Sequence, residues 1–329
     1  VFTCVDLTPA VISLSVSNGR IAEGYQHTAA IRTDGTLWCW GYNGYGQFGN
    51  GTTTSSFTPV QVSGGVTNWT QVSAGYYHTA AVRSDGTLWT WGYNGYGQLG
   101  DGTTTNRLVP VQVPGTNWVK VECGIHHTLA LKSDGSLWAW GYNFYGQLGD
   151  GTGTNRVSPV QISSFTGWLD VSTGGYHTLA VRGNGTLCSW GYNGFGQLGD
   201  GTTVDHAIPA PVTGISGPYL SISAGFNHSV VALSSGAARS FGYNGSGQLG
   251  DGTATNRSTP VTVSGITNCV EVSSGDNHSV FRLSTGTVSA CGYNGQGALG
   301  DGTTTTRLTP VNAIGTSNAG YISSFYRSS

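Results

Sequence analysis

Hydrophobic and polar residues alternate along this chain in short runs that are separated by clusters of Gly, Asn, Asp and Ser. Each run has the length and the β-branched or aromatic content of a strand, and no 3.6-residue period is long enough for a helix. The stretch from residue 58 to 102 contains four such runs, at residues 58–63, 70–74, 78–83 and 87–91. The last two flank Ser84-Asp85-Gly86, a hairpin signature. The pattern predicts a four-stranded antiparallel sheet, followed by a long loop over residues 92–107.

This unit recurs along the chain at a step of 49 to 51 residues. The tripeptide Gly-Tyr-Asn begins six times, at Gly41, Gly92, Gly141, Gly191, Gly242 and Gly292. A His followed by Thr or Ser keeps the same step, at His27, His78, His127, His177, His228 and His278. A fixed period of this length is typical of propellers and repeat arrays. Because no linker interrupts it, we expect residues 1–329 to form a single domain, whether or not the chain is a segment of a longer one.

The sheets must cover one another, because a four-stranded sheet of this size cannot bury both of its faces alone. Radial stacking around an axis achieves this and leaves only short edges. The sequence therefore predicts an all-β fold, a β-propeller with four-stranded antiparallel blades. Pairs such as Trp38 with Trp40 and Trp89 with Trp91 support it, since residues two apart on a strand point to one face and can fill the gap between blades.

The number of blades depends on how the two ends of the chain are used. Seven copies of a Pro-led run can be traced, from Pro9 to Pro310, but only six of the His-Thr run. We expect seven blades, the last composed of residues 310–324 and residues 1–6, because pairing the chain ends removes an open edge. The alternative is six closed blades with a spare half-blade, or a chain that continues beyond Ser329.

A family resemblance rests on the motif Gly75-x-x-His78-Thr79-x-Ala81, continued by Asp85-Gly86-x-Leu88-x-x-Trp91-Gly92-x-Asn94-x-x-Gly97-Gln98-Leu99-Gly100. This pattern resembles the regulator of chromosome condensation repeat, and its copies extend the resemblance over residues 7–324. The resemblance implies a propeller of the type whose best-known members have seven blades. It leaves the activity open, because function lies in loops grafted on the fold.

Composition excludes several classes of protein. Gly occupies 54 positions without the three-residue period of collagen, and 10 Trp, 16 Tyr and 10 Phe argue against a disordered chain. No stretch approaches the roughly 20 apolar residues of a membrane-spanning helix. A net charge of −2 gives no electrostatic footprint for duplex nucleic acid. We therefore expect a soluble protein with no nucleic-acid partner and no membrane span.

The repeated His residues are the first candidates for chemistry, as metal ligands or general bases. Each copy occupies the same place in its own unit, so the six do not converge as the ligands of one metal ion do. None stands out beside a nucleophile and an orienting partner. We interpret them as buried structural residues whose His-Thr pairs satisfy polar groups. We expect no catalytic residue, no metal and no cofactor.

Asp and Cys residues suggest no better site. Asp recurs before Gly-Thr, as at Asp101, without the alternating carboxylates of a calcium loop. We expect it to accept hydrogen bonds in a turn, with an Arg six residues later bracing the loop. The Cys residues occupy scattered repeat positions, which is typical of small apolar fillers. Cys4 is the exception, and we hypothesise a disulfide from it to Cys269 or Cys291 that locks the closing blade.

Variable positions inside the fixed frame are the best candidates for recognition. The second residue after Gly-Tyr-Asn is aromatic in the first four units and then becomes Ser246 and Gln296. We call these four aromatic residues the aromatic arc: Tyr45, Tyr96, Tyr145 and Phe195. We expect the arc to lie exposed on one face and to bind a partner, since Tyr is enriched at interface hot spots. Packing between neighbouring loops is the alternative role for these rings.

These observations favour a non-enzymatic binding or display module that recognises a protein or a glycan through one propeller face. Low charge, only two Lys and the absence of Met suggest a location outside a cell, on its surface or on a virion. A structural subunit that packs into a fibre, capsid or other assembly is the alternative. A regulator like the family's guanine-nucleotide exchange factors is a third, which the regular spacing disfavours because it leaves no room for a projecting insertion.

Overall fold

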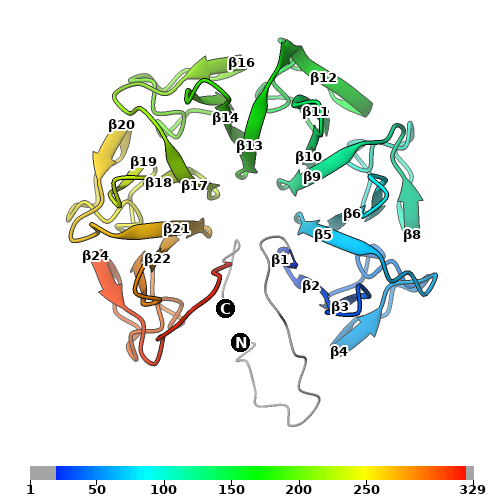
Figure 1. Ribbon diagram of the computed structural model, residues 1–329, viewed down its shortest axis with the longest axis horizontal. Helices are drawn as coiled ribbons and strands as arrows, with labels where there is room; N and C mark the ends of the chain where they lie inside the picture. The colour runs from blue at the N-terminus through cyan, green and yellow to red at the C-terminus, as the bar shows by residue number, and fades with distance from the viewer. Residues whose placement is uncertain (1–19, 324–329) are drawn as a thin grey trace.

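The protein is a ring of β-sheet blades, and its computed structural model describes residues 20–323 (Figure 1). These residues form six four-stranded antiparallel sheets, each with its strands hydrogen-bonded in chain order. In every blade the first strand lies beside the central axis and the fourth lies at the rim. The predicted all-β propeller is therefore confirmed.

The strands fall into four classes by their place in the blade. The first strands are β1 (Ile21–Glu23), β5 (Trp69–Ala74), β9 (Trp118–Cys123), β13 (Trp168–Thr173), β17 (Tyr219–Ala224) and β21 (Cys269–Ser274). The second strands are β2 (His27–Ile31), β6 (His78–Arg83), β10 (His127–Lys132), β14 (His177–Arg182), β18 (His228–Leu233) and β22 (His278–Leu283). The third strands are β3 (Leu37–Gly41), β7 (Leu88–Gly92), β11 (Ser136–Gly141), β15 (Leu187–Gly191), β19 (Ala238–Gly242) and β23 (Val288–Gly292). The fourth strands are β4 (Ser56–Gln61), β8 (Arg107–Gln112), β12 (Arg156–Thr166), β16 (His206–Pro211), β20 (Arg257–Thr262) and β24 (Arg307–Asn312).

The structure corrects the order of strands that the sequence suggested. The Pro-led run at residues 58–63 does not open a blade. It belongs to β4, which pairs with β3 as the outer strand of the preceding sheet. The long loop after each third strand returns the chain antiparallel to the same sheet, so a blade spans residues 69–112 and not 58–102.

The expectation of seven blades is corrected in the same way. Six blades are present in residues 20–323, and Pro310 lies in β24, the outer strand of the sixth. Residues 313–323, assigned to a composite closing blade, contain no strand. The other part of that blade, residues 1–6, lies outside the described residues.

The hairpin predicted around Asp85 is present between β6 and β7. The amide of Gly86 donates to the Arg83 carbonyl, and the Asp85 carboxylate accepts the Thr87 amide at 3.0 Å. Gly86 has a φ of 75°, a conformation that residues with a Cβ rarely adopt. The Asp-Gly pair therefore fixes the register in which His78 opposes Gly92.

Five hydrophobic clusters hold the ring together, one between each pair of consecutive blades. In the second to fifth blades, the second strand contributes to two clusters, because successive side chains of a strand point to opposite faces of the sheet. Ala80 faces the third blade, for example, whereas Ala81 faces the first. The predicted role of the Trp pairs is confirmed at Trp91, which is fully buried against the first blade, and Trp89 packs partly buried beside it.

A polar joint lies at the centre of each of these interfaces. Between the first two blades, the Thr79 hydroxyl donates to the backbone carbonyl of Gln47 at 2.9 Å. The Trp91 indole donates to the same carbonyl at 2.7 Å. The His27 Nε2 lies 2.9 Å from the Thr79 hydroxyl oxygen, whose own proton is already used, so Nε2 must carry the proton and donate. We call this set of contacts the blade joint.

The blade joint recurs around the ring with small changes. The His-hydroxyl contact is 3.0 Å for His78 with Thr128 and 2.9 Å for His177 with Ser229 and for His228 with Ser279. His127 is an exception, because its Nε2 has no partner among the described residues, although Thr178 still donates to the Gln147 carbonyl. The six His residues that the sequence analysis interpreted as structural are all buried, and four of them contact a hydroxyl group of the next blade.

The joint also explains the Gly three residues before each His. A Cβ added at Gly75 would lie 2.3 Å from the His78 ring and 2.5 Å from the Gly124 carbonyl of the next blade. Real side chains do not approach so closely, so these strand ends meet only because the residue is Gly.

In the described part of the chain, no helix has the length and apolar character that crossing a bilayer requires.

Replacing Thr128 by Val is expected to destabilise the fold, because the buried Nε2–H of His78 loses its acceptor while the volume is conserved. An unsatisfied buried donor costs about 1–3 kcal/mol of unfolding free energy. Urea denaturation measures this loss. The exposed Thr104→Val variant is the control and should change the free energy of unfolding by less than about 0.5 kcal/mol. Equal stability of the two variants would contradict the role of the joint.

Stability is expected to fall as the pH drops below about 6.5. Burial lowers the pKa of His27 to about 3, and burial is also the largest cause that lowers the pKa of His78, His127, His177, His228 and His278. Between the unfolded value of about 6.5 and these folded values, the unfolded chain binds more protons, so the free energy of unfolding decreases as pH falls. Each His contributes about 1.4 kcal/mol per pH unit once the pH is well below 6.5. Urea midpoints at pH 7.5, 6.0 and 5.0 test this, and an unchanged midpoint at pH 5.0 would refute it.

Candidate functional site

The loops that carry the aromatic arc are organised by the Asn of Gly-Tyr-Asn. In the second blade the Asn94 side chain is fully buried and donates to the carbonyls of Thr103 and Thr105 at 3.0 and 3.1 Å. Its carbonyl oxygen accepts the Leu99 amide at 2.9 Å. One side chain thus closes the loop from both ends, and Tyr96 is held in a defined position within it.

The predicted brace between Asp and Arg is confirmed in four of these loops. The Asp101 carboxylate accepts the Thr103 amide at 3.0 Å and pairs with the Arg107 guanidinium at 2.7 Å. Equivalent pairs join Asp150 to Arg156, Asp251 to Arg257, and Asp301 to Arg307. His206 replaces the Arg in the fourth blade and contacts Asp200 at 2.8 Å. The carboxylates predicted as turn acceptors therefore have their partners within the loop.

The four arc residues lie at the same end of successive blades and contact the next blade along the ring. Each ring packs against the Tyr of the following Gly-Tyr-Asn, with centroids 4.9 to 5.1 Å apart. The four pairs are Tyr45 with Tyr93, Tyr96 with Tyr142, Tyr145 with Tyr192, and Phe195 with Tyr243. All four arc residues are half-buried. The arc therefore packs between loops and is also accessible, so both predicted roles have a basis in the geometry.

Other aromatic residues extend the arc into a continuous surface. The turns between first and second strands open at this same end, and they bring Tyr77, His126 and Tyr176 to within 4.9 to 5.4 Å of the arc residue of the preceding blade. Tyr25 stacks on Tyr76 at 3.9 Å between the first two blades. We call the whole set the aromatic face: the aromatic arc with Tyr25, Tyr42, Tyr76, Tyr77, Tyr93, His126, Tyr142, Phe144, Tyr176, Tyr192, Phe226 and Tyr243.

The turn residues of this face were not identified from the sequence. They occupy the two variable positions between Gly and His in the motif Gly-x-x-His. Tyr or Phe is found there in the first, second, fourth and fifth units: Tyr25, Tyr76, Tyr77, Tyr176 and Phe226. These two positions vary from unit to unit, as the arc position does, and this variation is the sequence feature that could have identified them. The third unit places His126 at one of these positions, and the structure shows its ring among those of Tyr76, Tyr93 and Tyr96.

The aromatic face presents neutral hydroxyl groups and ring surfaces. Burial, followed by the influence of neighbouring Tyr residues, raises the pKa of Tyr77, Tyr93 and Tyr142 above the usual value. These phenols therefore remain protonated and can donate hydrogen bonds. Phe144 is the most exposed residue of the aromatic face, with 68% of its surface accessible to solvent.

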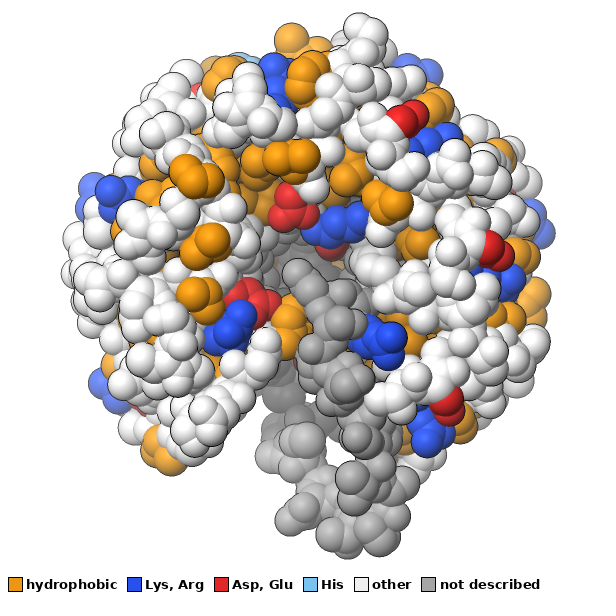
Figure 2. All heavy atoms as spheres, in the orientation of Figure 1, with side chains coloured by type: hydrophobic (Ala, Val, Ile, Leu, Met, Phe, Trp, Pro, Cys, Tyr) orange, Lys and Arg blue, Asp and Glu red, His pale blue; other side chains and the backbone are white. Residues whose placement is uncertain are grey.

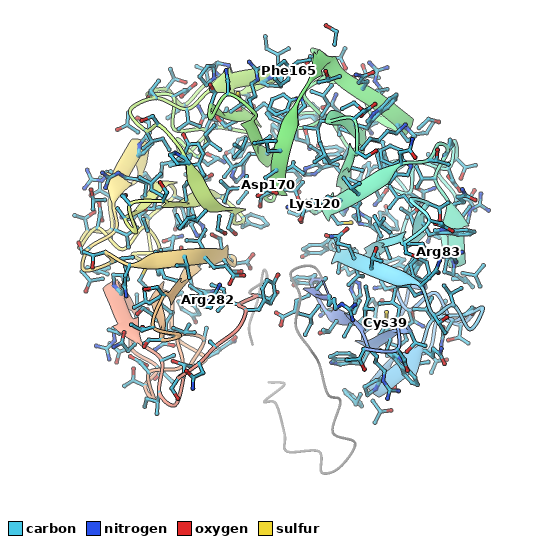
Figure 3. The ribbon with its side chains drawn as sticks, in the orientation of Figure 1. Cys39, Arg83, Lys120, Phe165, Asp170 and Arg282 are labelled. Atoms are coloured by element: carbon cyan, nitrogen blue, oxygen red, sulfur yellow. The ribbon has the colours of Figure 1, made fainter. Side chains whose placement is uncertain are left out.

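A second candidate site is the central channel, which encloses about 510 Å³. Figure 2 shows acidic and basic side chains at this central opening, and Figure 3 shows that Lys120 and Asp170 point into it. The Lys120 ammonium lies 2.5 Å from the Asp170 carboxylate and 3.2 Å from that of Glu122. Across the channel, Glu271 pairs with Arg282 at 2.6 Å.

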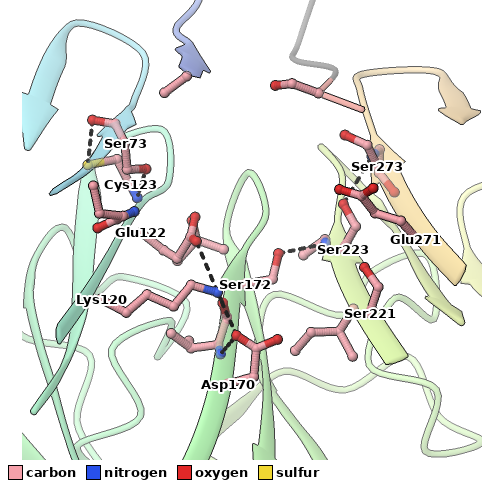
Figure 4. A pocket seen from close by; sticks show the side chains of 18 of the residues that line it. Ser73, Lys120, Glu122, Cys123, Asp170, Ser172, Ser221, Ser223, Glu271 and Ser273 are labelled. Atoms are coloured by element: carbon pink, nitrogen blue, oxygen red, sulfur yellow. Dashed lines mark hydrogen bonds and ion pairs between the residues drawn. The ribbon is translucent and has the colours of Figure 1, made fainter. Parts of the chain in front are cut away.

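Most polar groups of the channel wall are used to join one blade to the next. The Ser73 hydroxyl accepts the Cys123 amide at 2.9 Å (Figure 4). The Ser223 hydroxyl likewise accepts the Ser274 amide at 3.0 Å. Burial disfavours the charged form of Lys120, but the two neighbouring carboxylates outweigh it and raise the pKa of the ammonium group. The ion pairs thus stabilise the ring and leave few free groups for a ligand.

The His-hydroxyl pairs of the blade joints do not form a nucleophile and its base. In the pair of His177 with Ser229, the Ser hydroxyl donates its proton to the Gln197 carbonyl, and the His donates to the Ser oxygen. A general base would have to accept the hydroxyl proton instead. Both residues are fully buried, so a substrate cannot reach them.

Five Cys residues are buried free thiols, as expected of apolar fillers: Cys39, Cys123, Cys188, Cys269 and Cys291. Cys269 and Cys291, the two hypothesised partners of Cys4, are free thiols in the cluster between the fifth and sixth blades. Cys4 itself is outside the described residues.

Comparison with known proteins adds relatives that share part of this repeat array. The ultraviolet-B receptor UVR8 of Arabidopsis thaliana is 41% identical over 91 residues, which are 27% of this chain and 21% of the receptor. The mitochondrial RCC1 domain-containing protein RUG3 of the same plant is 33% identical over 105 residues, 31% of this chain and 23% of that protein. The matched segments thus span less than a quarter of either relative.

Two solved structures share the fold over nearly the whole chain. Human WBSCR16 superposes with a TM-score of 0.82 at 23% identity, over 94% of this chain and 86% of that one. Prp20p from Saccharomyces cerevisiae superposes with a TM-score of 0.78 at 24% identity, over 90% of this chain and 76% of that one. At these identities the likeness supports the fold alone.

Family profiles agree with the resemblance that the repeat motif indicated. The profile of the RCC1-like domain matches residues 6–281, and that of the regulator of chromosome condensation (RCC1) repeat matches residues 269–298. Since the first of these matches covers most of the sequence, the chain belongs to the family of the RCC1-like domain.

Proposed function

We propose that this protein is a non-enzymatic binding module that recognises a protein or a glycan through its aromatic face. The main observation behind this proposal is a continuous run of half-exposed aromatic rings from Tyr45 to Tyr243. Each arc residue packs against a Tyr of the next blade, with ring centroids 4.9 to 5.1 Å apart. Aromatic side chains offer a large contact area and lose little conformational entropy on binding.

The loops beneath this face support the proposal because they are pre-organised. Asn94 and its counterparts Asn43, Asn143, Asn193 and Asn244 are all fully buried and closed by the same hydrogen bonds. A surface that is already ordered before a partner arrives avoids part of the entropic penalty of association. The loops closed by these Asn side chains therefore have the same conformation in each blade, whereas the residues that they expose differ from blade to blade.

Relatives of the same fold favour a protein partner over a small ligand. The structure of Prp20p is described together with its binding properties to Gsp1p and histones, and yeast RCC1 (Prp20) is also known bound to Kap60. Those partners belong to Prp20p. For this chain they support only the broader proposal that an RCC1-like propeller presents a face to another protein.

We further propose that the module is displayed outside a cell, on a cell surface or on a virion, because only 9% of its residues are charged and Lys occurs twice. Protection of the protein from protease added to intact cells or particles would contradict this location. The alternative function is a structural subunit of a larger assembly. In that case the aromatic face would bind further copies or another subunit.

Substituting Ser at three arc positions is expected to abolish binding without unfolding the ring. Ser246 occupies the equivalent position in the fifth blade, so Tyr45→Ser, Tyr96→Ser and Tyr145→Ser introduce a residue that the loop already accommodates. Loss of one interface hot spot costs about 2 kcal/mol or more, about thirtyfold in affinity, and three should remove detectable binding.

The measurement compares ligand binding by the wild type, the triple variant and Leu169→Ser, on a glycan array and in pull-downs from cell extracts. Leu169 is 63% exposed at the start of β13, on the opposite side from the aromatic face, and serves as the control. A ligand retained by the wild type and the control, but lost by a triple variant of unchanged melting temperature, is the expected result. Retention by all three proteins would refute the site.

A further inference from the structure

The aromatic arc is built from a contact that repeats from blade to blade. In the first three blades, each arc residue contacts two rings of the next blade, with centroids 4.9 to 5.4 Å apart. One belongs to the Tyr of Gly-Tyr-Asn and the other to the second turn residue before the His. Phe195 contacts Tyr243 at 5.0 Å, and its turn position holds Asn227. We call each such set an arc subsite: Tyr45 with Tyr93 and Tyr77, Tyr96 with Tyr142 and His126, Tyr145 with Tyr192 and Tyr176, and Phe195 with Tyr243 and Asn227.

A buried Gln lies behind each arc residue. Its Oε1 accepts the backbone amide of the arc residue, two positions earlier, at 2.8 to 3.0 Å in all four blades. The Nε2 atoms of these side chains are buried and have no hydrogen-bond partner among the described residues: Gln47, Gln98, Gln147 and Gln197. In the fifth blade, where Ser246 replaces the aromatic residue, the Gln248 Nε2 donates to Asn277 at 3.4 Å. An unused donor thus accompanies an aromatic arc residue in the same four blades.

The arc subsites contain no cationic group. Burial lowers the pKa of His126 to about 4, so its imidazole is neutral at pH 7. In residues 20–323, the Arg and Lys side chains that lie over aromatic rings contact Trp residues or Phe165, and none contacts an arc residue. Phosphate, sulfate and carboxylate groups bind best through charge-assisted hydrogen bonds to cations. An acidic polymer is therefore a poor ligand for this surface, whereas a neutral ligand that bonds to phenol and amide groups fits it.

The arc subsites follow a curved path that ends after the fourth blade. Successive blades are arranged around the central axis, so one repeat position in four blades traces an arc (Figure 1). In the fifth and sixth blades this position holds Ser246 and Gln296, which offer no aromatic ring. A ligand that uses all four subsites must therefore bend along the ring and repeat its own contacts from one blade to the next.

From these observations we infer that the arc subsites bind a linear, neutral polysaccharide whose chain curves. The inference rests on the proposed binding role of the aromatic face and names the class of ligand. A pyranose unit has a face of C–H bonds that packs against the partially negative π-face of an aromatic ring. Its hydroxyl groups bond to phenol groups and accept from a Gln Nε2 when a neighbouring ring turns aside. Because the units of a polysaccharide are identical, they make the same contact in each subsite, which the irregular surface of a protein does not do.

Two series of neutral glucose oligomers whose linkages bend the chain are the probes: size-separated maltodextrins from maltose upward, and size-separated laminarin oligosaccharides from laminaribiose upward. Isothermal titration calorimetry with the full protein should show, for at least one series, an affinity that rises with oligomer length and then levels off. The expected rise is about tenfold for each further subsite that the oligomer reaches. Cellohexaose, whose linkages give a straight ribbon, should bind at least about tenfold more weakly than the bent oligomer of equal length.

The variant Ser246→Tyr tests the repetition by a gain of function. It adds an aromatic residue at the arc position of the fifth blade, in a loop whose Ser246 amide already donates to Gln248 as in the other four blades. The affinity should level off at a longer oligomer and reach a value about tenfold higher. Tyr45→Ser should make the affinity level off at a shorter oligomer. Leu169→Ser is the control and should change neither value, and melting temperatures check that each variant is folded.

The inference fails if neither series binds, if the affinity is independent of oligomer length, or if folded Ser246→Tyr binds every oligomer as the wild type does. Equal binding of cellohexaose would refute the curved chain. A protein ligand that is lost with Tyr45, Tyr96 and Tyr145, found without any oligosaccharide binding, would refute the polysaccharide and leave the proposed role of the aromatic face intact. Unchanged oligosaccharide binding by the triple Ser variant would instead refute both.

Discussion

The blade joint is the interaction on which the rest of this structure depends. A backbone carbonyl of one blade accepts the hydroxyl proton and, in three joints, the indole proton of the next blade. In four joints a His of the first of the two blades also donates to that hydroxyl. The groups are polar and lie in a hydrophobic interface, so each must be satisfied there or the interface loses stability. Partners in the joint lie about one repeat apart along the chain, for example 50 residues between His78 and Thr128. The constancy of the repeat length follows from this contact.

The joint also determines which residues remain available to bind a partner, because it uses most of the polar residues of the motif. It uses the His, Thr, Gln and Trp residues of the motif, and buried Asn and Asp side chains close the loops. The residues that vary lie outside this frame, at the two turn positions before each His and at the arc position. In this protein half of those positions are Tyr or Phe, and these residues form one aromatic face on a rigid ring.

Much of the fold could be predicted from the sequence because its determinants are local or periodic. The run at residues 78–83 coincides with β6, and Asp85-Gly86 forms the predicted hairpin turn. The assignment of the Pro-led strand to a blade was wrong, since a period contains no information about where a unit begins. The pairing of β3 with β4 depends on a loop that folds back through buried Asn43, which no local pattern reveals. The ion pair of Lys120 with Asp170 joins different blades, so sequence spacing alone did not identify it.

The candidate site was only partly predictable for a similar reason. The arc residues were identified because they vary within a fixed frame, but their neighbours Tyr77 and Tyr176 come from another turn of the next blade. Contact between the two sets follows from the way blades stack and not from their distance along the chain. Two of the sequence predictions, a binding role for the arc and a location outside the cell, remain proposals.

The central claim is that four of the repeated His residues, His27, His78, His177 and His228, are neutral and donate from Nε2 within the joints. Nitrogen NMR of the His side chains at pH 6 to 7 tests it most directly, because the two tautomers and the charged form have different shifts. The account predicts the neutral tautomer with the proton on Nε2 for His27, His78, His177 and His228. A charged ring, or a proton on Nδ1 that leaves Nε2 free to act as a base, would contradict it.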